Sequence, residues 1–176
     1  KKKFHETRPD FLILQYFIND AEVINKKTNS IIIRYSNFAA LLYQLIKSHS
    51  FKGTLVDYYN DLYKENSRGW VEAKESVKLI KNICEENNIK LAILFIPDFH
   101  NLSENNKLNK IYEKINDEFS MMGLDVINTF DALSKKFKSN SQKSWVSKDD
   151  PHPNSFAHEI IANEIYTYIM NRYPFF

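Results

Sequence analysis

The sequence predicts an α/β fold in which a parallel β-sheet lies between two layers of helices. Short, continuous apolar runs of strand length recur along the chain. Segments with apolar residues at helical spacing separate these runs, and strands that alternate with helices favour a parallel sheet covered on both faces. The 176 residues, 43% of them hydrophobic, have the size of one domain around one core. The predicted architecture is therefore a three-layer α/β/α sandwich.

Three segments have the pattern of buried strands. Residues 11–18 (FLILQYFI) form a nearly continuous apolar run that Asn19 and Asp20 close. Residues 91–96 (LAILFI) and 124–130 (LDVINTF) have the same character. Such continuity is typical of strands that are buried on both faces, as in the middle of a parallel sheet.

Helical periodicity predicts the covering layers. Apolar side chains recur three and four positions apart in residues 38–46, 73–84 and 108–122, and Gly123 follows the third segment as a helix-ending glycine. A last helix is predicted after Asn154. Its apolar face comprises Phe156, Ile160, Ile161, Ile165 and Ile169.

Composition excludes several classes of partner. The 24 basic and 22 acidic residues leave a net charge of +2, too little to predict binding to nucleic acid or to an anionic membrane. No apolar run approaches the roughly 18 residues of a membrane span. Cys84 is the only cysteine, so neither an intrachain disulfide nor a thiolate metal cluster can form. The cellular compartment stays open.

Candidate site residues follow two of the predicted strands. Asn19 and Asp20 come directly after the first strand, and Pro97 comes directly after the second. Because chemistry in parallel sheets collects at the carboxyl ends of the strands, we expect Asp20 and Pro97 to contact a substrate. Asn and Asp are also ordinary residues where a strand turns into a loop.

The segment from Asp149 to His158 (DDPHPNSFAH) holds the strongest chemical pattern. A catalytic histidine needs a carboxylate that fixes its tautomer, and His152 has Asp149 three residues before it, with Asp150 as a closer substitute. Asn154, just beyond, is a further candidate for substrate binding.

Two other interpretations of this segment stay open. It can be a turn before a helix, in which Asn154 or Ser155 is the cap and His152 is incidental. It can also be a metal site built from Asp149, His152 and His158, since such ligands suit zinc or manganese.

Taken together, these motifs resemble those of the SGNH (GDSL-like) hydrolase family. Residues 16–20 (YFIND) resemble its third block, Gly-x-Asn-Asp, and Asp149-x-x-His152 with Pro153 and Asn154 resembles its fifth. The similarity covers nearly all of the chain but only the later portion of the family's domain. It implies a flavodoxin-like fold and a single domain over residues 1–176 that is incomplete at its N-terminus.

The resemblance also implies a mechanism. His152 would be the general base, Asp149 its orienting carboxylate, and Asn19 an oxyanion donor worth roughly 3 to 4 kcal/mol. The implied activity is hydrolysis of a small-molecule or carbohydrate ester through an acyl-enzyme, without a metal or organic cofactor.

The sequence departs from the family pattern at two places. Phe17 stands where the third block has glycine, and no Gly-Asp-Ser motif, the source of the family's serine nucleophile, occurs. We therefore expect an upstream segment of the same protein to supply the serine, with Lys1 to Asp10 as the tail of a preceding helix. The residues shown would be inactive alone.

Alternative functions follow from the same features. The acyl-enzyme could be intercepted by a carbohydrate hydroxyl, which would make the protein an O-acyltransferase. Loss of the serine would instead leave a non-catalytic module that binds glycans or a protein partner.

Several other side chains have two interpretations. His100 either lines the site or is a surface residue, and His158 is expected to be structural. Tyrosines near Trp70 either stack on sugar rings or pack beneath a loop: Tyr58, Tyr59 and Tyr63.

Overall fold

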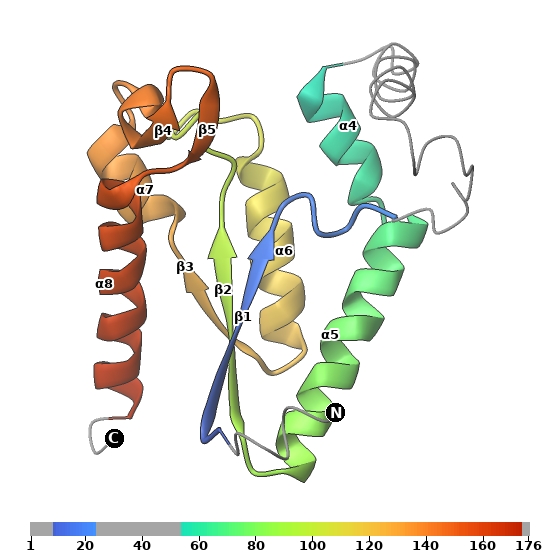
Figure 1. Cartoon of the computed structure of the whole chain (residues 1–176). Coiled ribbons are helices and arrows are strands. Elements are labelled where there is room, and N and C mark those ends of the chain that lie inside the picture. The colour runs from blue at the N-terminus through green and yellow to red at the C-terminus, as the bar shows by residue number, and fades with distance from the viewer. Residues whose placement is uncertain (1–8, 24–53, 174–176) are drawn as a thin grey trace, which may run out of the picture.

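The protein folds around a parallel three-stranded sheet, seen in a computed structural model that describes residues 9–23 and 54–173 (Figure 1). The strands are β1 (Phe11–Phe17), β2 (Lys90–Ile96) and β3 (Asp125–Asn128), in the order β1-β2-β3. Their parallel pairing brings the carboxyl ends of all three strands to the same edge of the sheet. This edge is where the candidate residues of β1 and β2 meet.

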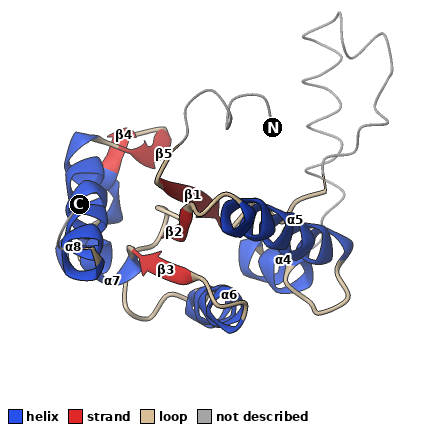
Figure 2. Ribbon diagram, turned by 90° about the horizontal axis from the view of Figure 1, so that it is seen from below, coloured by secondary structure: helices blue, strands red, loops and turns tan. Residues whose placement is uncertain are grey.

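Helices cover both faces of the sheet. The described helices are α4 (Leu55–Leu62), α5 (Arg68–Glu86), α6 (Asn109–Met121), α7 (Phe130–Phe137) and α8 (Ser155–Arg172). Figure 2 shows α7 and α8 on one side of the strands and α4, α5 and α6 on the other. The chain is thus a mixed α/β protein with a parallel sheet. None of the helices in the described segments has the length and apolarity needed to cross a bilayer.

A small β-hairpin stands above the carboxyl edge of the sheet (Figure 1). A 3-10 turn, Ser141–Ser144, leads into β4 (Trp145–Ser147), which pairs antiparallel with β5 (Asp150–Pro153). The register between the two strands shifts between Trp145 and Ser147. No strand was predicted here, and two prolines in four residues are unusual in a strand.

The core lies between the sheet and the helices. Strand β2 is buried from Ala92 to Ile96, as its continuous apolar pattern predicts. Side chains with less than 2% exposure from the surrounding helices pack around it: Trp70, Ile115, Phe119 and Leu133. Truncation of a buried aromatic such as Phe119 would cost roughly 3 to 5 kcal/mol.

The predicted elements are largely confirmed, with further differences besides the hairpin. The third strand ends at Asn128 instead of residue 130, because the Thr129 hydroxyl and amide both donate to the Phe95 carbonyl and Phe130 begins α7. Phe156, predicted on the buried face of the last helix, is 66% exposed. Helices α4 and α7 were not predicted. The predicted helix at 38–46 and residues 1–8 lie outside the described residues.

Candidate active site

A cavity of about 280 Å³ lies at the carboxyl edge of the sheet, between the ends of β1 and β2 and the β4–β5 hairpin. Its apolar walls come from aromatic and proline side chains: Phe17, Pro97, Phe99, Pro151 and Pro153. Its polar lining comes from five residues of four different segments: Asn19, Tyr59, Asp98, His100 and His152. Of the predicted site residues, the structure therefore brings Asn19, Pro97 and His152 together.

His152 lies on β5 with its ring held by a carboxylate. Its Nδ1 is 2.5 Å from Oδ1 of Asp150, and its backbone N–H donates to the same oxygen at 3.1 Å. Side chains two positions apart on a strand point to the same face, which is why these two residues meet. The hydrogen bonds from His152 hold the pKa of Asp150 below its usual value.

This pairing differs from the predicted one. Asp149 was expected to orient His152, but it is exposed and lies just before β5, three positions from the histidine. Asp149 belongs to the turn between β4 and β5, outside the strand whose alternation puts Asp150 and His152 on the same face. Asp150, the predicted substitute, therefore contacts the ring.

The contact leaves the other ring nitrogen available. With Nδ1 engaged by Asp150, the tautomer that donates through Nδ1 leaves a lone pair on Nε2. Nε2 has no hydrogen-bond partner within residues 9–23 and 54–173, and the side chain is 80% exposed. His152 can accept a proton from a ligand in the cavity.

Asn19 follows β1 in a tight turn. The Asp20 amide donates to the Phe17 carbonyl at 2.9 Å, and the Asp20 carboxylate accepts from the Phe17 amide at 2.8 Å. Asp20 does not line the cavity, so the structure gives it the role of closing the turn. The Asn19 side chain lines the cavity and has no hydrogen-bond partner in the described part of the chain.

Buried groups support this turn from below. The Tyr63 hydroxyl donates to the carbonyl of Ile18 at 2.7 Å and lies 3.0 Å from the Tyr16 hydroxyl. Burial raises the pKa of both hydroxyls, so they stay protonated. The Ala21 carbonyl packs against Gly69 at the start of α5 so closely that a Cβ there would overlap it.

Comparison with protein-family models, with curated proteins and with solved structures gave no match. The site is therefore interpreted from its own geometry.

A second histidine and carboxylate pair lies in the same cavity. His100 Nδ1 is 3.0 and 3.1 Å from the two oxygens of Asp98, in the segment that follows β2 and Pro97. The spacing, Asp-x-His, is the same as in Asp150-x-His152. Only His100, and not its pairing with Asp98, was predicted as a possible site residue, although the repeated spacing is visible in the sequence.

Asn154 has a structural role at the base of the hairpin. Its side-chain carbonyl caps α8 by accepting from the Ala157 amide, and its NH₂ group donates to the carbonyls of Lys143 and Trp145. These three bonds occupy the side chain, and Asn154 does not line the cavity. Asn154 was predicted to contact a substrate, but it caps α8 instead, as the alternative interpretation of this segment proposed.

Of the three tyrosines predicted to stack on sugar rings or pack beneath a loop, Tyr59 lines the cavity. Burial, with the Asp98 carboxylate nearby, raises its pKa to about 12, so its hydroxyl is a donor at neutral pH. Tyr63 and Trp70 instead pack in the core, with ring centroids 5.0 Å apart. They cannot stack on a sugar.

The metal interpretation finds no geometric support. Within the described ranges, no three residues of the His, Cys, Asp and Glu types are arranged to hold an ion. His158 lies exposed in the first turn of α8, with its amide bonded to the Asn154 carbonyl.

Proposed function

We propose that the cavity is the active site of an ester hydrolase of the SGNH type, which uses a serine nucleophile and an acyl-enzyme in a flavodoxin-like sandwich. One observation carries the proposal. The imidazole of His152, oriented by Asp150 and open at Nε2, lines the same cavity as the unpaired amide of Asn19. This is the acid-base and oxyanion part of a serine hydrolase site.

In the proposed reaction, a serine hydroxyl attacks the ester carbonyl while Nε2 of His152 takes the hydroxyl proton. The Asn19 N–H donates to the carbonyl oxygen as it becomes negative. When the tetrahedral intermediate collapses, the bond to the alcohol breaks and the imidazolium returns the proton to the departing oxygen. Water repeats the sequence on the acyl-enzyme and releases the acid.

The serine belongs to none of the described residues that line the cavity, where no serine, threonine or cysteine occurs. Ser141 and Ser144 lie nearby, but the Ser141 hydroxyl accepts from the Leu102 amide and the Ser144 hydroxyl donates to the Ser141 carbonyl. We place the nucleophile in chain outside residues 9–23 and 54–173.

The test is turnover of 4-nitrophenyl acetate by the full-length protein and its His152→Ala variant, with His158→Ala as a matched control. Loss of the base is expected to lower kcat by about 10³-fold or more, while His158→Ala stays at the wild-type level. A fluorophosphonate probe should label one serine, which mass spectrometry locates. Addition of a methyl glycoside separates hydrolysis from acyl transfer, because transfer yields an acetylated sugar.

A wild-type protein that neither turns over the ester nor reacts with the probe would contradict the proposal. It would favour the non-catalytic module. Full activity in His152→Ala would show that His152 is not the general base. The description of the fold would not be affected.

A further inference from the structure

The pair formed by Asp98 and His100 is a built feature of the cavity that the proposed hydrolysis does not use. Asp98 is the more enclosed of the two carboxylates, with 14% of its side chain exposed against 44% for Asp150. It accepts from both the backbone amide and the ring of His100. The carboxylate that orients His100 is therefore more shielded from solvent than the one on the hairpin.

Neighbouring groups contact the His100 ring and the Asp98 backbone. The Asp98 amide donates to the Tyr112 hydroxyl at 3.1 Å. The His100 ring meets Trp145 edge to face, with ring centroids 5.7 Å apart. Side chains immobilised in this way lose little entropy when a ligand binds, which favours recognition.

The atom of this pair that is left available to a ligand is Nε2 of His100, which is a hydrogen-bond acceptor. Because Nδ1 contacts the carboxylate, the ring donates there and leaves the Nε2 lone pair open, with no partner for Nε2 in the described segments. An Nε2 acceptor selects a ligand that donates, such as a hydroxyl. The Tyr59 hydroxyl, a donor in the same cavity, selects a ligand oxygen that accepts.

The surroundings define the ligand class. The Asp98 carboxylate disfavours an anionic ligand, and the apolar side chains of Phe17 and Phe99, which also line the cavity, favour C–H groups. A neutral group with several hydroxyls on a carbon ring meets these conditions. A volume of about 280 Å³ lies near the lower end of ordinary ligand pockets, roughly 300 Å³, and suits a single ring.

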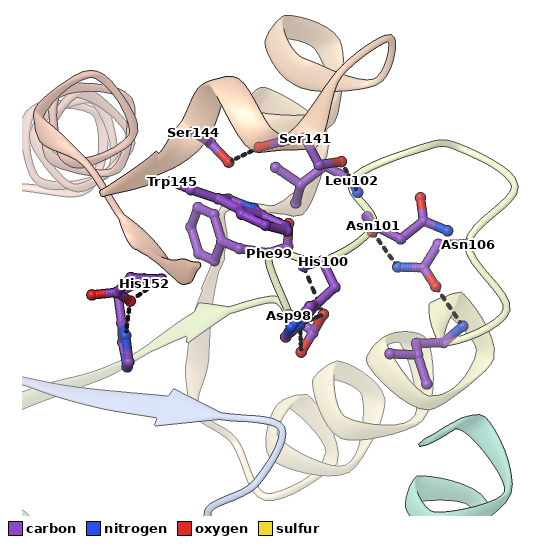
Figure 3. A network of polar contacts seen from close by, with 12 residues as sticks. Asp98, Phe99, His100, Asn101, Leu102, Asn106, Ser141, Ser144, Trp145 and His152 are labelled. Atoms are coloured by element: carbon purple, nitrogen blue, oxygen red, sulfur yellow. Dashed lines mark hydrogen bonds and ion pairs between the residues drawn. The ribbon is translucent and has the colours of Figure 1, made fainter. Parts of the chain in front are cut away.

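The two histidines are separated within the cavity. In Figure 3 they stand apart, with Phe99 between them in this view. Because both histidines line this one cavity, they can contact different parts of the same ligand.

We propose that Asp98 and His100 form a subsite that binds a hydroxyl of a sugar, the alcohol portion of the ester. This assignment of substrate class rests on the proposed hydrolase function.

The test compares the hydrolysis kinetics of acetylated methyl glycosides of glucose, galactose and mannose with those of 4-nitrophenyl acetate, in the full-length protein. His100→Ala should raise KM for at least one acetylated glycoside about tenfold and leave its kcat, and both constants for the aryl ester, within about twofold.

His100→Gln, whose side-chain amide oxygen again offers a hydrogen-bond acceptor at this position, should recover part of the lost affinity. The control is His158→Ala, which should leave both substrates unchanged. Equal losses on the two substrates, or no change on any glycoside, would overturn the subsite.

A direct binding measurement separates this inference from the hydrolase proposal. Non-hydrolysable methyl glycosides are titrated into the protein while the imidazole ¹H signals are followed, with the His100 signal assigned by its loss in His100→Ala. A shift of this signal, and not of the signal from His158, supports the subsite even if no ester is hydrolysed. Ester hydrolysis without any such shift removes the subsite and leaves the hydrolase proposal in place.

Discussion

The indole N–H of Trp145 donates a hydrogen bond to the backbone carbonyl of Phe99 at 2.8 Å. Trp145 begins the hairpin that bears His152, and Phe99 lies between Asp98 and His100 in the segment after β2. Figure 3 shows the indole lying across this segment. The two histidine-bearing segments, about fifty residues apart in sequence, are thus joined by one side chain.

Replacement of Trp145 by Phe tests this link. The variant keeps an aromatic ring but leaves the Phe99 carbonyl without its donor, which should lower the free energy of unfolding by about 1 to 3 kcal/mol. Urea denaturation measures the loss. Val146→Ala, at a neighbouring residue that is 58% exposed, is the control and should stay within about 0.5 kcal/mol of the wild type. Equal stabilities of Trp145→Phe and the wild type would contradict the role of the bond.

The choice between the two adjacent carboxylates is tested by Asp150→Asn and Asp149→Asn. Asparagine at 150 can present its NH₂ group to Nδ1 and favour the wrong tautomer, so kcat on 4-nitrophenyl acetate should fall by about 10⁴-fold. Asp149→Asn should leave kcat near the wild-type value, because residue 149 lies outside β5 and does not contact the ring. The opposite ranking would return the orienting role to Asp149.

The acidity of Asp150 provides a test that needs no activity. The hydrogen bonds from His152 hold the pKa of this carboxyl below its ordinary value of about 3.9. The interaction therefore contributes to stability above pH about 3.9, and this contribution is lost as the pH falls through the lower pKa of the folded state. A ¹³C titration of the carboxyl groups should show a low midpoint for Asp150, which returns toward about 3.9 in His152→Ala.

A second carboxyl serves as the control for this titration. A hydrogen bond from Lys138 holds the pKa of Glu104 below its usual value, and neither residue lines the cavity. The midpoint of Glu104 should stay low in His152→Ala. An Asp150 midpoint that does not respond to loss of the ring would show that the pair does not exist in solution.

Apolar runs and helical periodicity in the sequence made much of the fold predictable. The site was harder to predict, because short elements that carry little of either pattern position its residues. Strand β2 and helix α6 could be predicted because apolar runs and periodicity extend over their whole length. Helix α4 has only 8 residues and is mainly marked by its capping box, in which Thr54 and Asp57 satisfy each other's backbone amides. The sequence signal for that box, Thr-x-x-Asp, was present.

The carboxylate partner of His152 could not be predicted from spacing alone. Asp149 and Asp150 are both within reach of His152 along the chain, and only the strand conformation of Asp150–Pro153 decides between them. Two prolines made that strand hard to predict, because proline is rare within strands. Both strands of the two-stranded β4–β5 sheet are edge strands, where proline is tolerated because one side of the strand needs no backbone donor.

Gly69 links the start of α5 to the turn that carries Asn19. In Gly69→Ala the new Cβ would overlap the Ala21 carbonyl, so the backbone must move at a cost of about 1 to 3 kcal/mol. Because Ala21 is two residues from Asn19, we expect kcat to fall together with the melting temperature. Gly123→Ala is the contrast: its φ of 74° strains alanine by roughly 1 to 2 kcal/mol, far from the cavity, so stability should fall while kcat is kept.

Tyr63 anchors the Asn19 turn through its hydroxyl. Tyr63→Phe removes the donor to the Ile18 carbonyl and the partner of the Tyr16 hydroxyl, both in the core, and should cost about 1 to 3 kcal/mol in unfolding free energy. Since Ile18 precedes Asn19, kcat should fall as well. Tyr16→Phe should cost stability but little activity, because Tyr63 keeps its bond to Ile18.

The matched control for these variants is Tyr166→Phe on α8, where the side chain is 64% exposed and the hydroxyl bonds to no described residue. It should change neither stability nor kcat. If Tyr63→Phe and Tyr16→Phe lower kcat equally, the effect comes from general loosening of the core and not from the anchor on Ile18. A selective loss in Tyr63→Phe would instead show that the position of the Asn19 amide depends on a hydroxyl more than forty residues away.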